Sequence, residues 1–212
     1  MTRRILTCLS TAALLTAAWL AAPAPARAGD PPASGLAESY RLQARGEYQA
    51  ALDAFRPALN AQPKSYFFRL RYAYLLLLAG KSAEAADSYR LACSYEPNAI
   101  EPVLGLQQAL LAAEKYDLAE KACRDALSRD SKNYTSMSRL AWAQFSRKDY
   151  KAAAESYGKV LALYPADTDM RLGLGWSLLY AGSRKEAEQE FRAVLEMLPD
   201  NASAKQGVEQ SR

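Results

Sequence analysis

The chain has 212 residues, of which 50% are hydrophobic and 24% are charged, with three cysteines and no histidine. This length and apolar fraction support a sizeable core, whereas the missing histidine removes the commonest general base and the commonest zinc ligand. The net charge of +4 includes Arg3, Arg4 and Arg27, and without these three, 24 basic residues face 23 acidic ones. No clustered basic surface for nucleic acid is therefore expected.

Residues 1–28 are predicted to form a secretory signal peptide. Two arginines near the start precede the apolar stretch 5–22, and Pro23 and Pro25 follow it. The next three residues, which end at Ala28, have the small-x-small form that a signal peptidase requires. We expect cleavage after Ala28, which makes the mature chain an exported, periplasmic protein.

Two other readings of this segment are open. An uncleaved segment would anchor the chain in the membrane, although the prolines and the cleavage motif favour removal. A lipoprotein signal at Cys8 fits poorly because the apolar region follows that cysteine. No second apolar run of membrane length follows residue 28, so we expect a soluble mature form that begins with a short linker at 29–34 and is either periplasmic or secreted.

The rest of the chain repeats with a period of 34 residues. Proline recurs at Pro63, Pro97, Pro165 and Pro199, with Ser131 at the remaining position. Alanine recurs at Ala51, Ala85, Ala119, Ala153 and Ala187. Four positions after each alanine stand Phe55, Tyr89, Cys123, Tyr157 and Phe191, with the cysteine as the exception among large residues. The period defines five copies without an insertion, at 32–65, 66–99, 100–133, 134–167 and 168–201.

Each copy is predicted to form two helices joined by a short turn. In the second copy, apolar residues at helical spacing over 70–78 end at Gly80, and a second helix runs from about 83 to 95. One such hairpin cannot bury its own apolar face, so neighbouring copies must stack. We expect a solenoid over 35–212, closed by a polar helix at 202–212.

Three local irregularities are predicted within this pattern. Ser34 is expected to be the N-cap of the first helix, because the proline- and glycine-containing residues around it are poor helix interior. Pro57 falls inside a predicted helix and should kink it. Glu114 and Lys148 replace the turn glycine, so these two turns are not expected to need a left-handed residue.

The period and its columns together resemble the tetratricopeptide repeat (TPR) family. The family's 34-residue unit combines a Gly-Asp-Tyr-like turn, an alanine, an aromatic residue, a second alanine and a closing proline, and the turn is matched at 46–48, 114–116 and 148–150. The resemblance implies an all-α, right-handed solenoid of five helix-turn-helix repeats plus a C-terminal capping helix. It also implies that the first helices of the repeats line a concave groove.

Carried over residue by residue, the resemblance assigns one central groove column and a second row one turn later. The central column consists of Tyr40, Tyr74, Gln108, Trp142 and Trp176, and the second row adds Phe145 and Tyr180. Aromatic residues are favoured at binding surfaces, so we expect both tryptophans to be exposed and to bind a peptide without supporting the core. The alternative is that groove residues only pack between helices, which would suit Leu77, Leu104 and Leu172.

No catalytic constellation is evident in the sequence, and no enzyme activity, cofactor or metal site is predicted. A hydrolytic triad lacks its histidine, and Gly173-Leu174-Gly175 has no strand before it and so is not a phosphate-binding loop. Cys93 and Cys123 occupy core columns, where free buried thiols are favoured over a disulfide.

The favoured function is a non-enzymatic scaffold or adaptor of the cell envelope that binds a peptide or a helix in the groove. The alternatives are a self-associating structural subunit of an envelope assembly, which would be a homo-oligomer, and an accessory protein of an enzyme. A protein or peptide is the expected partner, and nucleic acid is not. Leucine and aromatic residues stand where chaperone-tail TPR grooves hold a terminal carboxylate with Lys and Asn, so an acidic tail is not the expected ligand.

Overall fold

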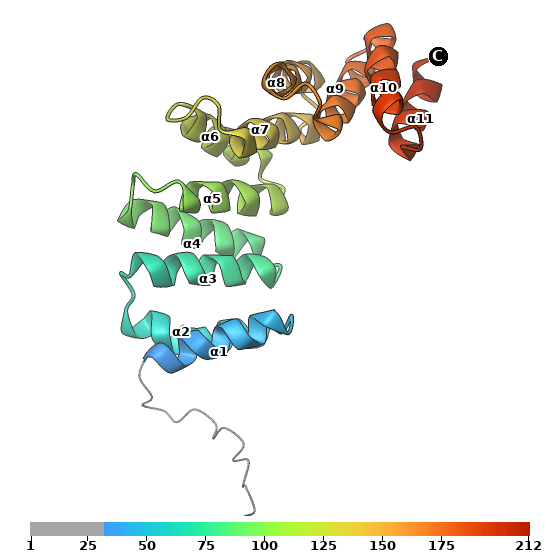
Figure 1. Ribbon diagram of the computed structural model, residues 1–212. Helices are drawn as coiled ribbons and strands as arrows, with labels where there is room; N and C mark the ends of the chain where they lie inside the picture. The colour runs from blue at the N-terminus through green and yellow to red at the C-terminus, as the bar shows by residue number, and fades with distance from the viewer. Residues whose placement is uncertain (1–31) are drawn as a thin grey trace, which may run out of the picture. The chain divides into compact units, whose positions relative to one another are not determined.

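The computed structural model describes residues 32–212, with side chains from Gly35 onward, and this range contains helices and no strand. The predicted signal peptide with its cleavage site, Cys8 and the start of the 29–34 linker lie outside the described residues. The helices are α1 (Pro32–Ala44), α2 (Tyr48–Ala61), α3 (Tyr66–Leu78), α4 (Ser82–Tyr95), α5 (Glu101–Ala112), α6 (Tyr116–Leu127), α7 (Tyr134–Ser146), α8 (Tyr150–Leu163), α9 (Thr168–Tyr180), α10 (Arg184–Met197) and α11 (Ala202–Ser211) (Figure 1).

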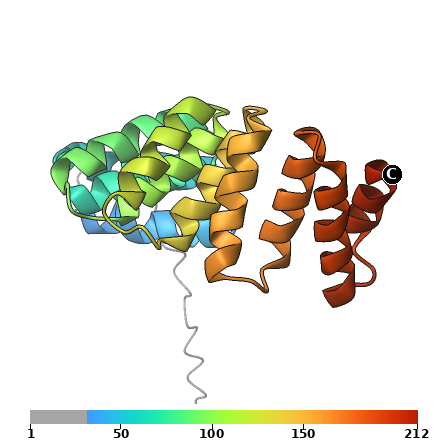
Figure 2. The same cartoon turned by 90° about the horizontal axis from the view of Figure 1, so that it is seen from above.

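The helices pair as the 34-residue period predicts. The odd-numbered helices α1 to α9 are the first helices of five repeats, and the even-numbered helices α2 to α10 are the second. Each helix packs against the next in the chain, and α3, α5, α7 and α9 also contact one another in order. Figure 2 shows this stacking in the C-terminal repeats, where successive helices lie side by side. The all-α solenoid of five hairpins and a terminal helix is thus confirmed.

The stack ends with α11, as predicted. Asn201 caps this helix by accepting a hydrogen bond of 2.9 Å from the backbone N–H of Ala204. Ala204 and Val208 are buried against Phe191 and Val194 of α10. The apolar face of the last hairpin is therefore covered, which a terminal repeat requires.

The beginning of α1 differs from the prediction. The helix begins at Pro32 rather than after Ser34, so Ser34 is not the N-cap. A proline is well tolerated in the first turn, where its missing N–H has no intrahelical partner. Gly35 lies inside this helix. A Cβ atom there would lie 2.7 Å from the carbonyl oxygen of Ala54, so the glycine permits the close approach of α2. The second helix runs through Pro57 without interruption.

The turns within the repeats also correct the sequence analysis. Gly46, Gly80 and Gly182 have φ angles of 77°, 74° and 93°, and Glu114 and Lys148 adopt the same left-handed conformation with φ of 56° and 66°. The last two turns were not expected to need this conformation, yet both adopt it. The turn geometry is set by the position in the 34-residue unit, and at these two positions a side chain is held where glycine is favoured.

The recurring columns of the period form the core. The alanines Ala51, Ala85, Ala119, Ala153 and Ala187 are fully buried. Tyr89 and Tyr157 fit against glycines of the following first helix: a Cβ atom would lie 2.2 Å from the Tyr89 ring at Gly105 and 2.5 Å from the Tyr157 ring at Gly173. At the intervening junction, small Cys123 lies near the long side chain of Arg139. A large residue thus meets a small one at each of these junctions.

Both described cysteines are free, which supports the prediction of free thiols over a disulfide. Cys123 is buried, and its burial raises its pKa to about 12. Cys93 is only half-buried, so the expectation that both thiols are buried holds for Cys123 alone. Cys123 therefore fills a core position as a small apolar residue.

Candidate functional site

The predicted central column lies on one face of the repeats, which we call the first-helix face because α1, α3, α5, α7 and α9 supply it. Tyr40, Tyr74, Gln108 and Trp142 are exposed there, one residue on each of four first helices. Trp142 has 52% of its surface exposed, an unusual fraction for a side chain whose apolar area favours burial. Trp176, the fifth member of the column, is half-buried.

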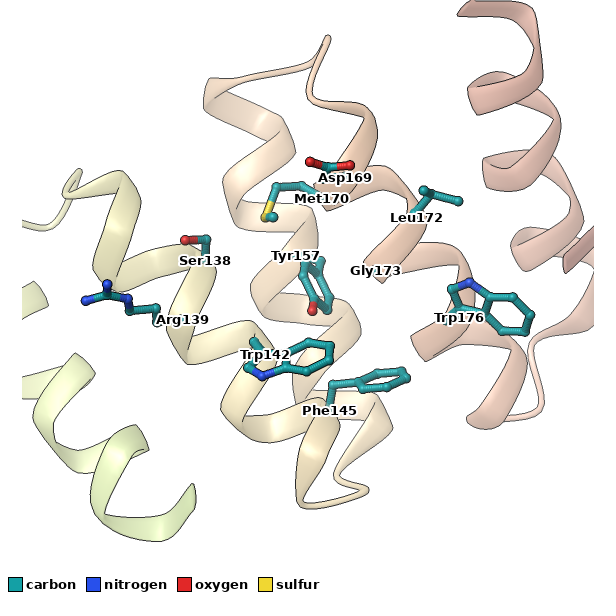
Figure 3. Close-up of a pocket in the computed structure, with 10 residues that line it drawn as sticks. All are labelled: Ser138, Arg139, Trp142, Phe145, Tyr157, Asp169, Met170, Leu172, Gly173 and Trp176. Carbon is teal, nitrogen blue, oxygen red and sulfur yellow. The ribbon is translucent and has the colours of Figure 1, made fainter. Parts of the chain in front are cut away.

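A pocket of about 430 Å³ opens on this face between α7 and α9, and we call it the α7–α9 pocket. Figure 3 shows Trp142 and Phe145 extending from α7 and Trp176 from α9, with Tyr157 of α8 between the two helices. Gly173 forms part of the floor, where the absent side chain leaves room for the Tyr157 ring. The walls are thus mainly apolar and aromatic, as in sites that bind side chains of a ligand.

Five rings beside this pocket form a continuous aromatic cluster. Trp142 stacks on Phe145 at 5.9 Å between ring centroids, and Phe145 lies 6.0 Å from Tyr180. Tyr180 in turn lies 5.1 Å from Tyr150 and 5.8 Å from Trp176. Tyr150 was not among the predicted site residues, because its position at the start of α8 marked it as a turn residue. The mutual contacts hold the rings in place, so they present a rigid surface.

The two tryptophans have different structural roles. Trp176 packs against buried Phe191 at 5.0 Å, and its indole Nε1 donates a hydrogen bond of 2.9 Å to Ser203 Oγ at the start of α11. The expectation that both rings leave the core unsupported is therefore wrong for Trp176. Trp142 has the greater exposure and no such bond, so it is the candidate ligand contact.

The leucines around the central column mostly have packing roles. Leu77 is partly buried against the core of the N-terminal repeats, and Leu172 against the core of the last hairpin. This supports the packing alternative for these two residues. Gln108 is exposed and accepts a hydrogen bond of 3.3 Å from Arg139, so it interrupts the aromatic column with a polar side chain.

A second pocket of about 430 Å³ lies on the same face and is lined by residues of α1, α3, α4 and α5; we call it the α1–α5 pocket. Its walls include Tyr40, Tyr74, Tyr89 and Arg71. The Arg71 guanidinium lies 3.8 Å from the centre of the Tyr40 ring, a cation–π contact. Burial holds the pKa of Arg71 below its ordinary value and raises that of Tyr89 to about 12.

Sequence reasoning did not identify Arg71 or its counterpart Arg139 as site residues. Arg71 donates hydrogen bonds to Ser39 Oγ at 3.2 Å and to Gln43 Oε1, while its Nε has no partner. Arg139 donates to the carbonyl of Leu104 at 2.6 Å. A signal was available, since both arginines stand at the same position of their repeats, 68 residues apart.

Within 32–212 no cluster of three or more acidic or cysteine side chains is arranged to hold a metal ion. None of the helices in this range combines the length and the apolar character needed to cross a bilayer.

Several solved structures share this fold. MamA from Desulfovibrio magneticus RS-1 is 18% identical, with a TM-score of 0.73 over 82% of this chain and 98% of that one. A tetratricopeptide repeat protein from Parabacteroides merdae is 17% identical, with a TM-score of 0.75 over 85% and 72% of the two chains. YrrB, described as a TPR protein with an unusual peptide-binding site, is 15% identical, with a TM-score of 0.70 over 82% and 90%.

No curated protein sequence matches the chain. Sequence models of the tetratricopeptide repeat, however, match residues 36–99, 104–168 and 144–210. These matches span nearly all the described helices. The chain therefore belongs to the tetratricopeptide repeat family.

Proposed function

We propose that this protein is a non-enzymatic scaffold that binds a peptide or a helix of a partner protein along the first-helix face. The observation that carries the proposal is Trp142, whose half-exposed ring is fixed by stacking on Phe145 at the edge of an apolar pocket. A rigid aromatic residue next to a pocket gives a large contact area at a low entropy cost. The peptide-binding site named for YrrB, which has the same fold, supports this choice.

The test is a selection from a random peptide display library with the chain from Gly29 onward, which contains every described helix. Peptides that are enriched are then titrated against variants. Trp142→Ala is expected to weaken binding about 30-fold, because truncation of a central anchor costs about 2 kcal/mol. Leu118→Ala is the matched control, since it truncates an exposed apolar side chain on α6, outside both pockets.

Three outcomes are informative. Selective loss of binding in Trp142→Ala, with an unchanged helical circular dichroism spectrum, supports the proposal. Equal affinity of Trp142→Ala and the parent chain shows that the ligand surface lies elsewhere. Failure to enrich any peptide, together with a concentration-dependent mass by light scattering, favours the self-associating subunit instead.

We further propose that this scaffold acts in the cell envelope after export. The support is the N-terminal sequence, in which a basic start, an apolar stretch and the small-x-small motif ending at Ala28 follow one another. Sequencing of the N-terminus of the protein from a native periplasmic extract is expected to begin at Gly29 or within a residue or two. A cytoplasmic protein that retains Met1 would contradict export.

A further inference from the structure

The two pockets of the first-helix face share several lining positions at a spacing of 68 residues, which is two repeats. In the α1–α5 pocket, four lining residues are Arg71, Tyr74, Tyr89 and Glu101. In the α7–α9 pocket, the residues at the same four positions are Arg139, Trp142, Tyr157 and Asp169. Each pocket therefore combines an arginine, an exposed aromatic ring, a buried tyrosine and an acidic residue.

The packing of the core keeps this combination out of the third and fifth repeats. The intervening repeats have Gly105 and Gly173 at the position of the two arginines. The rings of Tyr89 and Tyr157 occupy the space beside these glycines, where any Cβ atom would collide with them. An arginine is therefore excluded from those two repeats.

The two arginines have neutral partners. Arg71 has only 7% of its surface exposed, and its hydrogen bonds go to a hydroxyl and an amide oxygen. Arg139 donates to a backbone carbonyl and to an amide oxygen. Neither forms an ion pair with a carboxylate of the described residues, in contrast to Arg124, which binds Glu120 at 2.7 Å. Each guanidinium has five N–H donors and uses two here.

We propose that the first-helix face contains two related subsites for one polypeptide that carries two acidic residues, each next to an aromatic or large aliphatic residue. This inference rests on the proposed function and specifies its ligand. A carboxylate of the ligand would pair with each partly desolvated guanidinium, which is the strongest class of hydrogen bond available there. The neighbouring apolar side chain would enter the pocket of about 430 Å³.

The acidic residue of each subsite determines where the ligand carboxylate binds. Glu101 and Asp169 stand in the first turns of α5 and α9, on the first helix after the one that carries the arginine. A ligand carboxylate beside them would be repelled, so the acidic residue of each pair lies on the side of the arginine.

The peptide selection described above also tests this inference. The enriched sequences are expected to contain two Asp or Glu residues, each within one or two positions of Trp, Phe, Tyr or Leu. Arg71→Gln and Arg139→Gln are each expected to weaken binding about 10-fold, and the double variant about 100-fold. Arg90→Gln removes the same charge from an exposed ion pair with Asp87 on α4 and is the control without effect.

Matched changes in the peptide keep the test independent of folding. Replacing one Glu of the peptide by Gln is expected to weaken its binding to the parent chain about 10-fold. The same replacement should cause no further loss of affinity for the variant that lacks the arginine of that subsite. Enriched peptides without acidic residues, or equal losses in both backgrounds, overturn the two-subsite inference. If those peptides still lose affinity in Trp142→Ala, the proposed function stands without it.

Discussion

The contact between Tyr89 and Gly105 is a direct test of how neighbouring repeats fit together. A Cβ atom at Gly105 would lie 2.2, 2.5 and 2.6 Å from three carbon atoms of the Tyr89 ring. The ring is nearly fully buried, so it has little room to move away. Overpacking costs about 1–3 kcal/mol, and three contacts of this kind place the cost near 3 kcal/mol.

Alanine also has a higher helix propensity than glycine, by about 1 kcal/mol, which offsets part of this cost. Gly105→Ala is therefore expected to lower the free energy of unfolding by about 2 kcal/mol. Gly158 on α8 is the matched control, because a Cβ atom there meets nothing within 4 Å. Gly158→Ala should raise the free energy of unfolding by up to about 1 kcal/mol.

Urea unfolding followed by circular dichroism measures both variants, and the difference between them should be about 3 kcal/mol. In a Tyr89→Cys background, which copies the residue at position 123, the collision disappears. Gly105→Ala should then stabilise the chain as Gly158→Ala does. Stabilisation by Gly105→Ala in the parent chain would refute the packing argument.

Three other properties follow from the structure. Glu114→Gly and Lys148→Gly should each raise the free energy of unfolding by about 1 kcal/mol in urea titrations, because φ is positive at both positions. In thiol titrations of the native chain, half-buried Cys93 should react slowly and buried Cys123 only after denaturation. Burial raises the pKa of Tyr157 from 10.0 to about 12, so the unfolded chain loses this proton first, and stability should fall as the pH rises through that range.

Each of these has a control. Gly80→Ala, at a turn with φ of 74°, should destabilise the chain, and stabilisation there would contradict the strain argument. Rapid reaction of both thiols in the native chain would mean that Cys123 is accessible. Tyr157→Phe should reduce the loss of stability between pH 10 and 12, and an unchanged pH profile would show that this phenol is not responsible.

The sequence was sufficient to predict the repeat architecture, because each column of the period corresponds to one packing requirement. The buried alanines mark close approach of helix axes, and the second-repeat helices agree with the predicted ranges to within a few residues. Errors arose where residue type was weighed above position. The absence of glycine at Glu114 and Lys148 suggested that these turns need no left-handed residue, yet both residues adopt positive φ angles.

The site was predicted less completely than the fold. Exposure of Tyr40, Tyr74 and Trp142 followed from their register on the first helices. The role of Trp176 did not, because its partners come from α10 and α11, outside its own repeat. A contact between repeats depends on which residues meet across the junction, and a single column does not contain that information.

Arg71 and Arg139 were missed for the same reason, although pairs of columns in adjacent repeats contain the relevant information. Considered one column at a time, Arg71 and Arg139 are two cations among many on a helical face. Across the junctions between repeats, the rings of Tyr89 and Tyr157 leave no room for a side chain at Gly105 and Gly173, which are the equivalents of the two arginines in the next repeats. The stability of a solenoid is approximately a sum of contributions from single repeats and from the interfaces between neighbours. Pairs of columns in adjacent repeats therefore predict its packing better than single columns. The pairs Tyr89–Gly105 and Tyr157–Gly173 exclude arginine from the third and fifth repeats, which leaves the proposed ligand subsites at the second and fourth.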